Sequence, residues 1–188
     1  MERTAEKNEL WEWLKTIGIA ILLAWGIQSF LFSPIKVSGA SMMPTFEDGD
    51  KVVVNKISSK WMELDRFDVI VFESSEDTHY IKRIIGVPGD HIAYKNDELF
   101  INGEKYEETY LEEYKKELKG NSKLTGNFVL EESLGEAVVP AGHYFVLGDN
   151  RLYSKDSRDP DVGFVSADKV LGTAKIVIWP MSNFGVNK

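Results

Sequence analysis

The chain has 188 residues, a formal net charge of −8 and no cysteine. The negative charge argues against a nucleic-acid partner, and the absence of cysteine excludes disulfides and thiolate metal sites. The histidines are scattered at positions 79, 91 and 143 without a metal-binding spacing, so we do not expect a metal site.

The first predicted element is an apolar helix. Residues 16–32 carry no charge, and at about 1.5 Å of rise per residue they would extend roughly 25 Å. Ser33 and Pro34 end the segment, since proline cannot continue a helix, and Trp11 and Trp13 lie where an interfacial aromatic belt is expected. The pattern predicts a cytoplasmic segment over residues 1–15 and a transmembrane anchor over 16–33.

A cleaved secretory signal is the alternative interpretation of the same segment. Ser38 and Ala40 satisfy the small-residue rule for cleavage before Ser41. However, the apolar run is longer than the usual stretch of about 7 to 15 residues, and four glutamates precede it. These features favour an uncleaved anchor.

Residues 34–188 are predicted to form one mainly β, antiparallel domain, because short β-branched and aromatic runs recur between turn residues. Asn96 and Asp97 indicate a hairpin, and Pro88, Gly89 and Asp90 indicate a turn. The expected strands are 51–55, 68–72, 80–87, 91–94, 98–102, 143–147 and 173–179.

Residues 104–136 interrupt this pattern with nine glutamates and five lysines. Thr109 and Glu112 have the spacing of a capping box, an apolar stripe follows at residues 111, 114 and 118, and Gly120 would end the helix. We expect a charged surface insertion with one short helix.

Two residues suggest hydrolytic chemistry. A serine such as Ser41 is a good nucleophile only beside a base, and a lysine such as Lys82 is a useful base near neutral pH only if burial lowers its pKa. On a strand, Tyr80 and Ile84 would share the face of Lys82, which could point inward with them or outward beside Arg83. Spacing alone leaves both orientations open, and Ser41 could belong to an ordinary loop.

Five ordered motifs favour the catalytic interpretation. Together they resemble the bacterial type I signal peptidases of the Ser/Lys class, in the short single-anchor form typical of Gram-positive bacteria. The motifs are residues 41–45 (SMMPT), 49–56 (GDKVVVNK), 66–72 (RFDVIVF), 80–90 (YIKRIIGVPGD) and 148–158 (GDNRLYSKDSR).

The resemblance implies a role for each matching residue. Ser41 would be the nucleophile, its amide an oxyanion donor, Lys82 the general base, and Ser154 the group that orients Lys82. Further residues would support the site, namely Asp149, Asn150, Asp156 and Arg158. Others would form the walls of shallow pockets that admit small residues before the cut, namely Met42, Tyr80 and Ile81.

The implied protein is a membrane-bound serine endopeptidase with an extracytoplasmic catalytic domain and no cofactor. It would cleave signal peptides from exported preproteins after small residues and contact membrane lipids through its anchor. Three departures from the family pattern are Gly39 two residues before Ser41, the polar-to-apolar change at Leu152 and Tyr153, and a loop after Arg158 that is about two residues longer. Histidine replaces lysine as base in the related enzymes of the endoplasmic reticulum, which draws attention to His79.

Two other classes remain open from the sequence. A self-cleaving Ser/Lys protease would need a DNA-binding module where this chain has its apolar segment. A non-catalytic secreted β-domain would place no constraint on Ser41 or Lys82 and predicts a mature N-terminus near Ser41.

Overall fold

The structure is a computed structural model that describes residues 2–57, 63–74, 78–117 and 123–186. It divides into two compact units, residues 1–33 and 34–188. Gly120, the predicted helix stop, lies outside the described residues.

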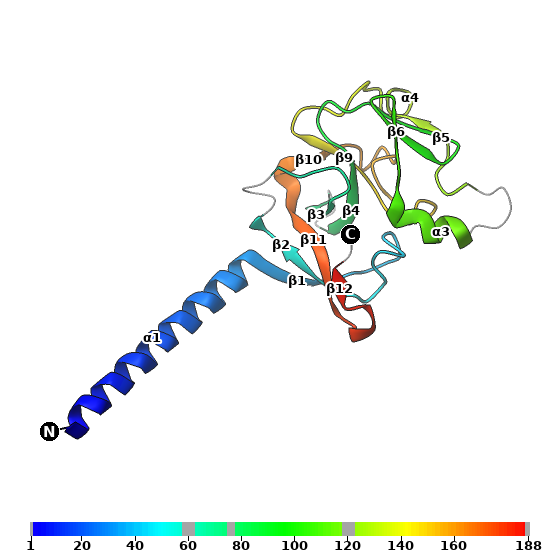
Figure 1. Cartoon of the computed structure of the whole chain (residues 1–188). Helices are drawn as coiled ribbons and strands as arrows, with labels where there is room; N and C mark the ends of the chain where they lie inside the picture. The colour runs from blue at the N-terminus through cyan, green and yellow to red at the C-terminus, as the bar shows by residue number, and fades with distance from the viewer. Residues whose placement is uncertain (1, 58–62, 75–77, 118–122, 187–188) are drawn as a thin grey trace. The chain divides into compact units, whose positions relative to one another are not determined.

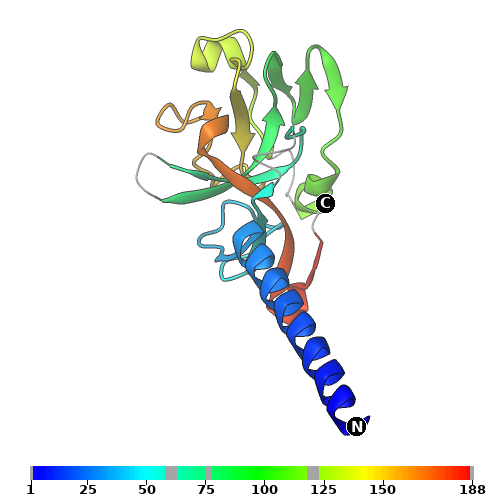
Figure 2. The same ribbon diagram turned by 90° about the vertical axis from the view of Figure 1, so that its left-hand side faces the viewer.

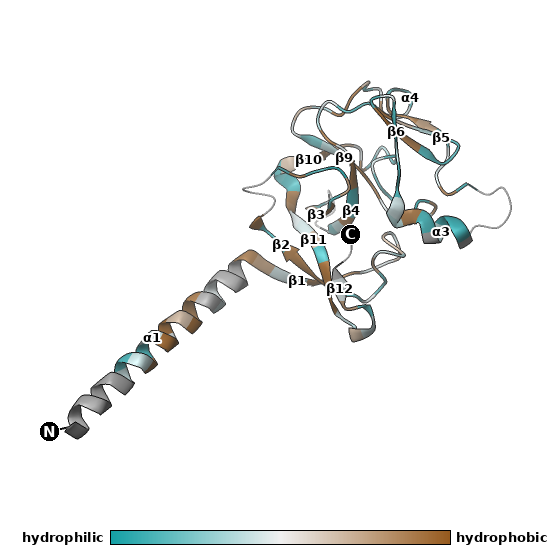
Figure 3. Cartoon of the chain, viewed as in Figure 1, coloured by the Kyte–Doolittle hydropathy of each residue, from teal (hydrophilic) through white to brown (hydrophobic). Residues whose placement is uncertain are grey.

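The first unit is the helix α1 (Glu2–Leu31). The strand β1 (Phe32–Lys36) follows it directly, because the residue before Pro34 is sterically disfavoured in the helical region. The predicted segment 16–33 is therefore helical only as far as Leu31. Apolar side chains in the middle of α1 are exposed, including Ile17, Leu22 and Trp25, and that stretch is coloured hydrophobic in Figure 3. Over the part of the chain that is described, no helix has both the length and the apolar character needed to cross a membrane, so the anchor stays a prediction.

The second unit contains a large curled sheet with the strand order β1-β2-β11-β3-β4-β9-β10, and β12 pairs with β11 (Figure 1). The pairs from β2 through to β10 are antiparallel. Its other strands are β2 (Lys51–Asn55), β3 (Val69–Glu73), β4 (His79–Gly86), β9 (His143–Leu147), β10 (Val165–Ser166), β11 (Val170–Trp179) and β12 (Gly185–Val186).

A smaller antiparallel sheet has the order β7-β6-β5-β8. It contains β5 (Ile92–Lys95), β6 (Glu98–Ile101), β7 (Glu104–Tyr106) and β8 (Phe128–Val129). The predicted hairpin joins β5 to β6, and both turn residues have a positive φ, 52° for Asn96 and 68° for Asp97, a conformation that Asn and Asp tolerate better than most residues. The predicted antiparallel β-domain is confirmed, and all seven predicted strands are present.

The charged insertion differs from its prediction. Its described residues contain β7, β8 and three short helical segments, η1 (Thr109–Leu111), α3 (Glu112–Glu117) and α4 (Leu130–Leu134). The predicted capping box is absent, because Thr109 begins a 3₁₀ turn that has no side-chain cap. The insertion lies mostly at the surface, as expected, but it also contributes Glu108, Leu111 and Leu130 to the interior, which the sequence did not predict.

Both faces of the large sheet carry a core. On β3, Val69 and Val71 pack into one cluster, while Ile70 and Phe72 pack into another on the opposite face. A third cluster, around Phe145, joins β9 to the small sheet. Two further short helical segments in the described part of the chain are η2 (Ala167–Lys169) and η3 (Met181–Asn183). The central strands β3 and β4 are thus buried on both faces along most of their length.

Candidate active site

Lys82 lies on β4 and points into the domain. Its cross-strand partner on β3 is Ile70, and that of Tyr80 is Phe72; directly opposed residues share a face of the sheet. The Lys82 ammonium lies 5.1 Å from the centre of the Tyr80 ring, and only 3% of the residue is exposed. The inward orientation is therefore the observed one.

Ser41 meets Lys82 from the loop that follows β1. The distance from Lys82 Nζ to Ser41 Oγ is 2.9 Å, and Lys82 Nζ also donates a hydrogen bond to the Ile81 carbonyl at 2.9 Å. A nucleophile and a base at this separation can exchange a proton directly. The fold thus brings together two residues that are 41 positions apart.

Burial brings the pKa of Lys82 into the range that a general base near neutral pH requires. Removal of the ammonium from water lowers the pKa of Lys82 to about 8, although the negative charges of Asp156 and Asp149 act in the opposite direction. An appreciable fraction of Lys82 is therefore neutral, and able to accept a proton, near physiological pH.

The turn after β9 fixes the loop that carries Ser41. The Asn150 amide donates to the Ser41 carbonyl at 3.1 Å, and the Asn150 side chain donates to the Ala40 carbonyl at 3.0 Å. Among the described residues, no acceptor faces the amide hydrogen of Ser41 itself. Asn150, a predicted supporting residue, therefore holds the backbone of the loop that carries Ser41.

Gly148 allows this close approach. A Cβ atom at position 148 would lie 2.2 Å from Ser154 Oγ and 2.4 Å from the Ser41 carbonyl oxygen. Ser154 thus lies against the turn, yet its buried hydroxyl has no hydrogen-bond partner among the described residues. The expected hydrogen bond from Ser154 to Lys82 is not formed in this structure, and its orienting role stays a prediction.

We expect Gly148→Ala to lower kcat/KM by about 100-fold, because the added methyl group must displace the backbone of Ser41 and a misplacement of about 1 Å has an effect of this order. Steady-state cleavage assays would measure it. Gly126→Ala is the matched control, since a Cβ atom there meets nothing within 4 Å. Equal activity of the two variants would contradict this account of Gly148.

Asp149 anchors the turn to β4. Arg83 forms two hydrogen bonds to its carboxylate, at 2.9 and 2.7 Å, and Thr45 donates another. Arg83 also donates to the Phe67 carbonyl at 2.8 Å and stacks 3.9 Å from the centre of the Tyr110 ring. Arg83 is buried as fully as Lys82, because both faces of β4 are covered.

Asp156 and Arg158, two of the predicted supporting residues, form an ion pair with two contacts of 2.8 Å. Asp156 also accepts a hydrogen bond from the Gly148 amide at 3.0 Å, so the pair braces the same turn. The lengthened loop beyond Arg158 closes on itself, since the amides of Val162 and Gly163 both donate to the Asp159 carbonyl at 2.9 Å.

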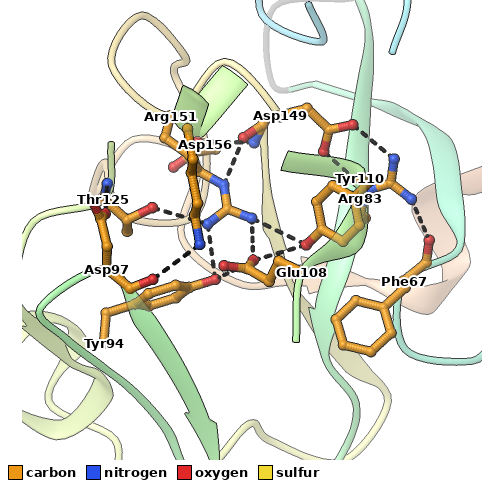
Figure 4. Close-up of polar contacts among 12 residues, drawn as sticks. Phe67, Arg83, Tyr94, Asp97, Glu108, Tyr110, Thr125, Asp149, Arg151 and Asp156 are labelled. Carbon is orange, nitrogen blue, oxygen red and sulfur yellow. Dashed lines mark hydrogen bonds and ion pairs between the residues drawn. The ribbon is translucent and has the colours of Figure 1, made fainter. Parts of the chain in front are cut away.

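Arg151 is a site residue whose role the sequence did not predict (Figure 4). Its guanidinium group pairs with Glu108 and lies within hydrogen-bond distance of the hydroxyls of Tyr94 and Tyr110. It also donates to the Gly148 carbonyl at 3.1 Å. The insertion is thereby connected to the catalytic turn. Arg151 lies inside a recognised motif, but no spacing in the sequence indicates its partners.

A groove of about 320 Å³ opens beside Ser41 and Lys82. The three predicted wall residues, Met42, Tyr80 and Ile81, all line it, together with residues 35–38 at and after the end of β1. Met42 and Ile81 are nearly inaccessible to solvent, so they form its floor. His79 also lines the groove but is exposed. Within the described residues, no group of three His, Asp or Glu side chains could hold a metal ion.

Comparisons with known proteins agree on one family. A family model described as signal peptidase, peptidase S26, matches residues 10–179. A protein named signal peptidase I from Bacillus caldolyticus is 44% identical over 179 residues, 95% of this chain and 94% of that protein. Signal peptidase IB from Staphylococcus aureus (strain MRSA252) is 40% identical over 185 residues, with 96% and 95% covered. A crystal structure of a signal peptidase I from Enterococcus faecalis V583 is 42% identical, with a TM-score of 0.56, and the match covers 59% of this chain and 96% of that one.

Proposed function

Because the chain belongs to the signal peptidase family, peptidase S26, we propose that it is a serine endopeptidase that removes signal peptides from exported preproteins. It would cut after small residues in an Ala-x-Ala-like pattern. The observation that carries this proposal is the 2.9 Å contact between Ser41 Oγ and the buried Lys82 Nζ.

In the proposed mechanism, neutral Lys82 takes the proton of Ser41 as Oγ attacks the scissile carbonyl. The Ser41 amide stabilises the oxyanion. Lys82 then passes the proton to the leaving amine, and an acyl-enzyme forms. Water, activated by the same lysine, hydrolyses this ester and releases the signal peptide. Ser154 would orient Lys82, since its hydroxyl is buried and has no hydrogen-bond partner among the described residues.

The groove supports the proposed preference for small residues. Its floor is formed by Met42 and Ile81, and the edge of the sheet at β1 runs along it. An extended segment of the preprotein could add main-chain hydrogen bonds there, with the residues before the cut directed at the shallow floor.

A membrane anchor in α1 is part of the proposal. It is supported by the uncharged stretch of residues 16–32 and by exposed apolar side chains such as Ile19, Ile21 and Leu23. The N-terminus would be cytoplasmic and the catalytic domain extracytoplasmic. Placing enzyme and substrate on one membrane raises their effective concentration, so a groove with weak affinity for the substrate can still bind it.

The test is cleavage of a preprotein with an Ala-x-Ala site by the full chain, extracted from membranes in detergent. We expect cleavage after the second Ala, no turnover by Ser41→Ala, and an intact mass that includes residues 1–40. Product masses locate the cut, and Ser33→Ala, outside the site, is the control. Turnover by Ser41→Ala would contradict the assignment of the nucleophile. A mature N-terminus near Ser41 would contradict the anchor.

A further inference from the structure

A second groove of about 320 Å³ lies next to the catalytic one. Buried or half-buried apolar side chains form its interior, namely Phe72, Val162 and Val165, and Ser74 and Ser166 also line it. It lies between the end of β3 and the segment 161–169, which project from the domain on the same side in Figure 2.

The two grooves adjoin at Tyr80. Tyr80 lines both of them, and its ring stacks edge-on against Phe72 with 6.0 Å between centroids. An ion pair of 3.1 Å also bridges them, between Lys155 of the catalytic groove and Asp161 of the second groove. The register of β3 and β4 places Tyr80 and Lys82 on one face of the sheet. A chain that passes Lys82 and crosses Tyr80 therefore enters the second groove.

The chemistry decides which part of a substrate takes this route. Lys82 returns its proton to the leaving amine, so the product that begins at this amine starts beside Lys82 Nζ. Under the proposed function, residues before the cut occupy the catalytic groove along β1, on the near side of the Tyr80 ring, which leaves the second groove beyond the ring for those after it. We propose that the second groove binds an apolar side chain of the preprotein just after the cleavage site. This inference rests on the proposed peptidase function.

The distance from Lys82 to the Tyr80 ring indicates which substrate residue reaches the second groove. The Tyr80 ring centre is 5.1 Å from Lys82 Nζ, and an extended chain advances about 3.3 Å per residue. The groove beyond the ring thus corresponds to about the second to fourth residue after the cut.

Three peptides with the same Ala-x-Ala segment test the proposal. One ends one residue after the cut, and the other two continue for six residues with either Leu or Gly at the second to fourth positions. We expect the detergent-solubilised full chain to cleave the Leu peptide with a kcat/KM about tenfold above that of the other two, as one apolar side chain in a pocket can supply. The truncated peptide reports on the catalytic site alone.

Ser166→Trp should fill the second groove and reduce the Leu-to-Gly ratio of kcat/KM to about one, and Ser74→Trp should do so from the opposite wall. Glu132→Trp, on the exposed face of α4, should keep the tenfold ratio. A ratio near one in the unmodified protein, or a tenfold ratio that persists in both groove variants, would overturn the inference. If none of the peptides is cut at the Ala-x-Ala site, the proposed function itself fails.

Discussion

Lys82→Met is expected to lower kcat/KM for an Ala-x-Ala substrate by about 10⁴-fold, as the loss of the base in a serine protease does. Methionine nearly matches the length of lysine but cannot take the Ser41 proton. Steady-state cleavage assays would measure the loss. Lys105→Met, which removes an exposed lysine on the small sheet, should retain full activity. Substantial residual activity in Lys82→Met would disprove the dyad and direct attention to His79, which also lines the groove.

The activity of the unmodified protein should rise with pH for the same reason. Only neutral Lys82 can act as a base, and its pKa is about 8. Well below that pH, each unit of increase should raise kcat/KM about tenfold, with a plateau above pH 8 to 9. A profile that is flat between pH 6 and 8 would show that Lys82 is not the titrating base.

Lys82→Met should nevertheless be the more stable protein at pH 7. In the unmodified protein the pKa of Lys82 falls from 10.5 in the unfolded chain to about 8 on folding, so folding opposes the protonation of Lys82. The penalty is fully present below pH 8 and disappears as pH rises to the unfolded value. We expect a gain of up to about 3 kcal/mol in the free energy of unfolding at pH 7, measured by urea denaturation. If Lys82→Met is instead less stable than the unmodified protein, its loss of activity would be explained by misfolding.

The strands could be predicted because their signals are local. Runs of β-branched and aromatic residues between turn residues define β2 and β9 to the residue, and Asn96 with Asp97 defines the hairpin between β5 and β6. The orientation of Lys82, in contrast, could not be predicted from the neighbouring residues in the sequence. Neighbouring residues on a strand face opposite ways, so either Lys82 or Arg83 would be exposed on a sheet with one open face. Here a second layer covers that face and buries both.

The buried part of the insertion was not predicted, because composition does not reveal which charges are paired. Nine glutamates in 33 residues indicate solvation, yet Glu108 is buried against Arg151, 43 positions away. The capping box failed for the same reason, since Glu108 and Tyr110 are positioned by tertiary contacts with Arg151 rather than by a helix start at Thr109. The pairing of Ser41 with Lys82 is equally distant in sequence, and the ordered motifs, not spacing, predicted it.

Catalytic geometry and stability converge on the turn at residues 148–151. The Gly148 carbonyl accepts a hydrogen bond from Arg151, its amide donates one to Asp156, and its Cα lies against the Ser41 carbonyl. Glu108 therefore acts on the nucleophile only through Arg151, as a positioning residue. The small sheet and the insertion are not an accessory to the site, because they supply the anion that neutralises Arg151.

Glu108→Leu is expected to reduce the free energy of unfolding by about 3 to 5 kcal/mol, because it leaves the guanidinium of Arg151 buried and unpaired. Burial by itself would raise the pKa of Glu108, but the Arg151 charge and the hydrogen bonds of the cluster outweigh it and lower the pKa below the ordinary value of 4.5. The stability from this group is thus present above pH 4.5 and is lost as the pH falls further. Urea denaturation at pH 7 and at pH 4 would measure both effects.

Glu98→Leu is the matched control, since it breaks an ion pair with Lys105 that is half exposed and should leave the free energy of unfolding almost unchanged. Combining Glu108→Leu with Arg151→Met should recover at least half of the lost stability, because an apolar pair removes the buried unpaired charge. The activity of the double variant should stay low, since the Gly148 carbonyl has lost its donor. Recovery of both stability and activity would show that Arg151 serves packing alone, and equal losses in Glu98→Leu and Glu108→Leu would contradict the importance of the buried pair.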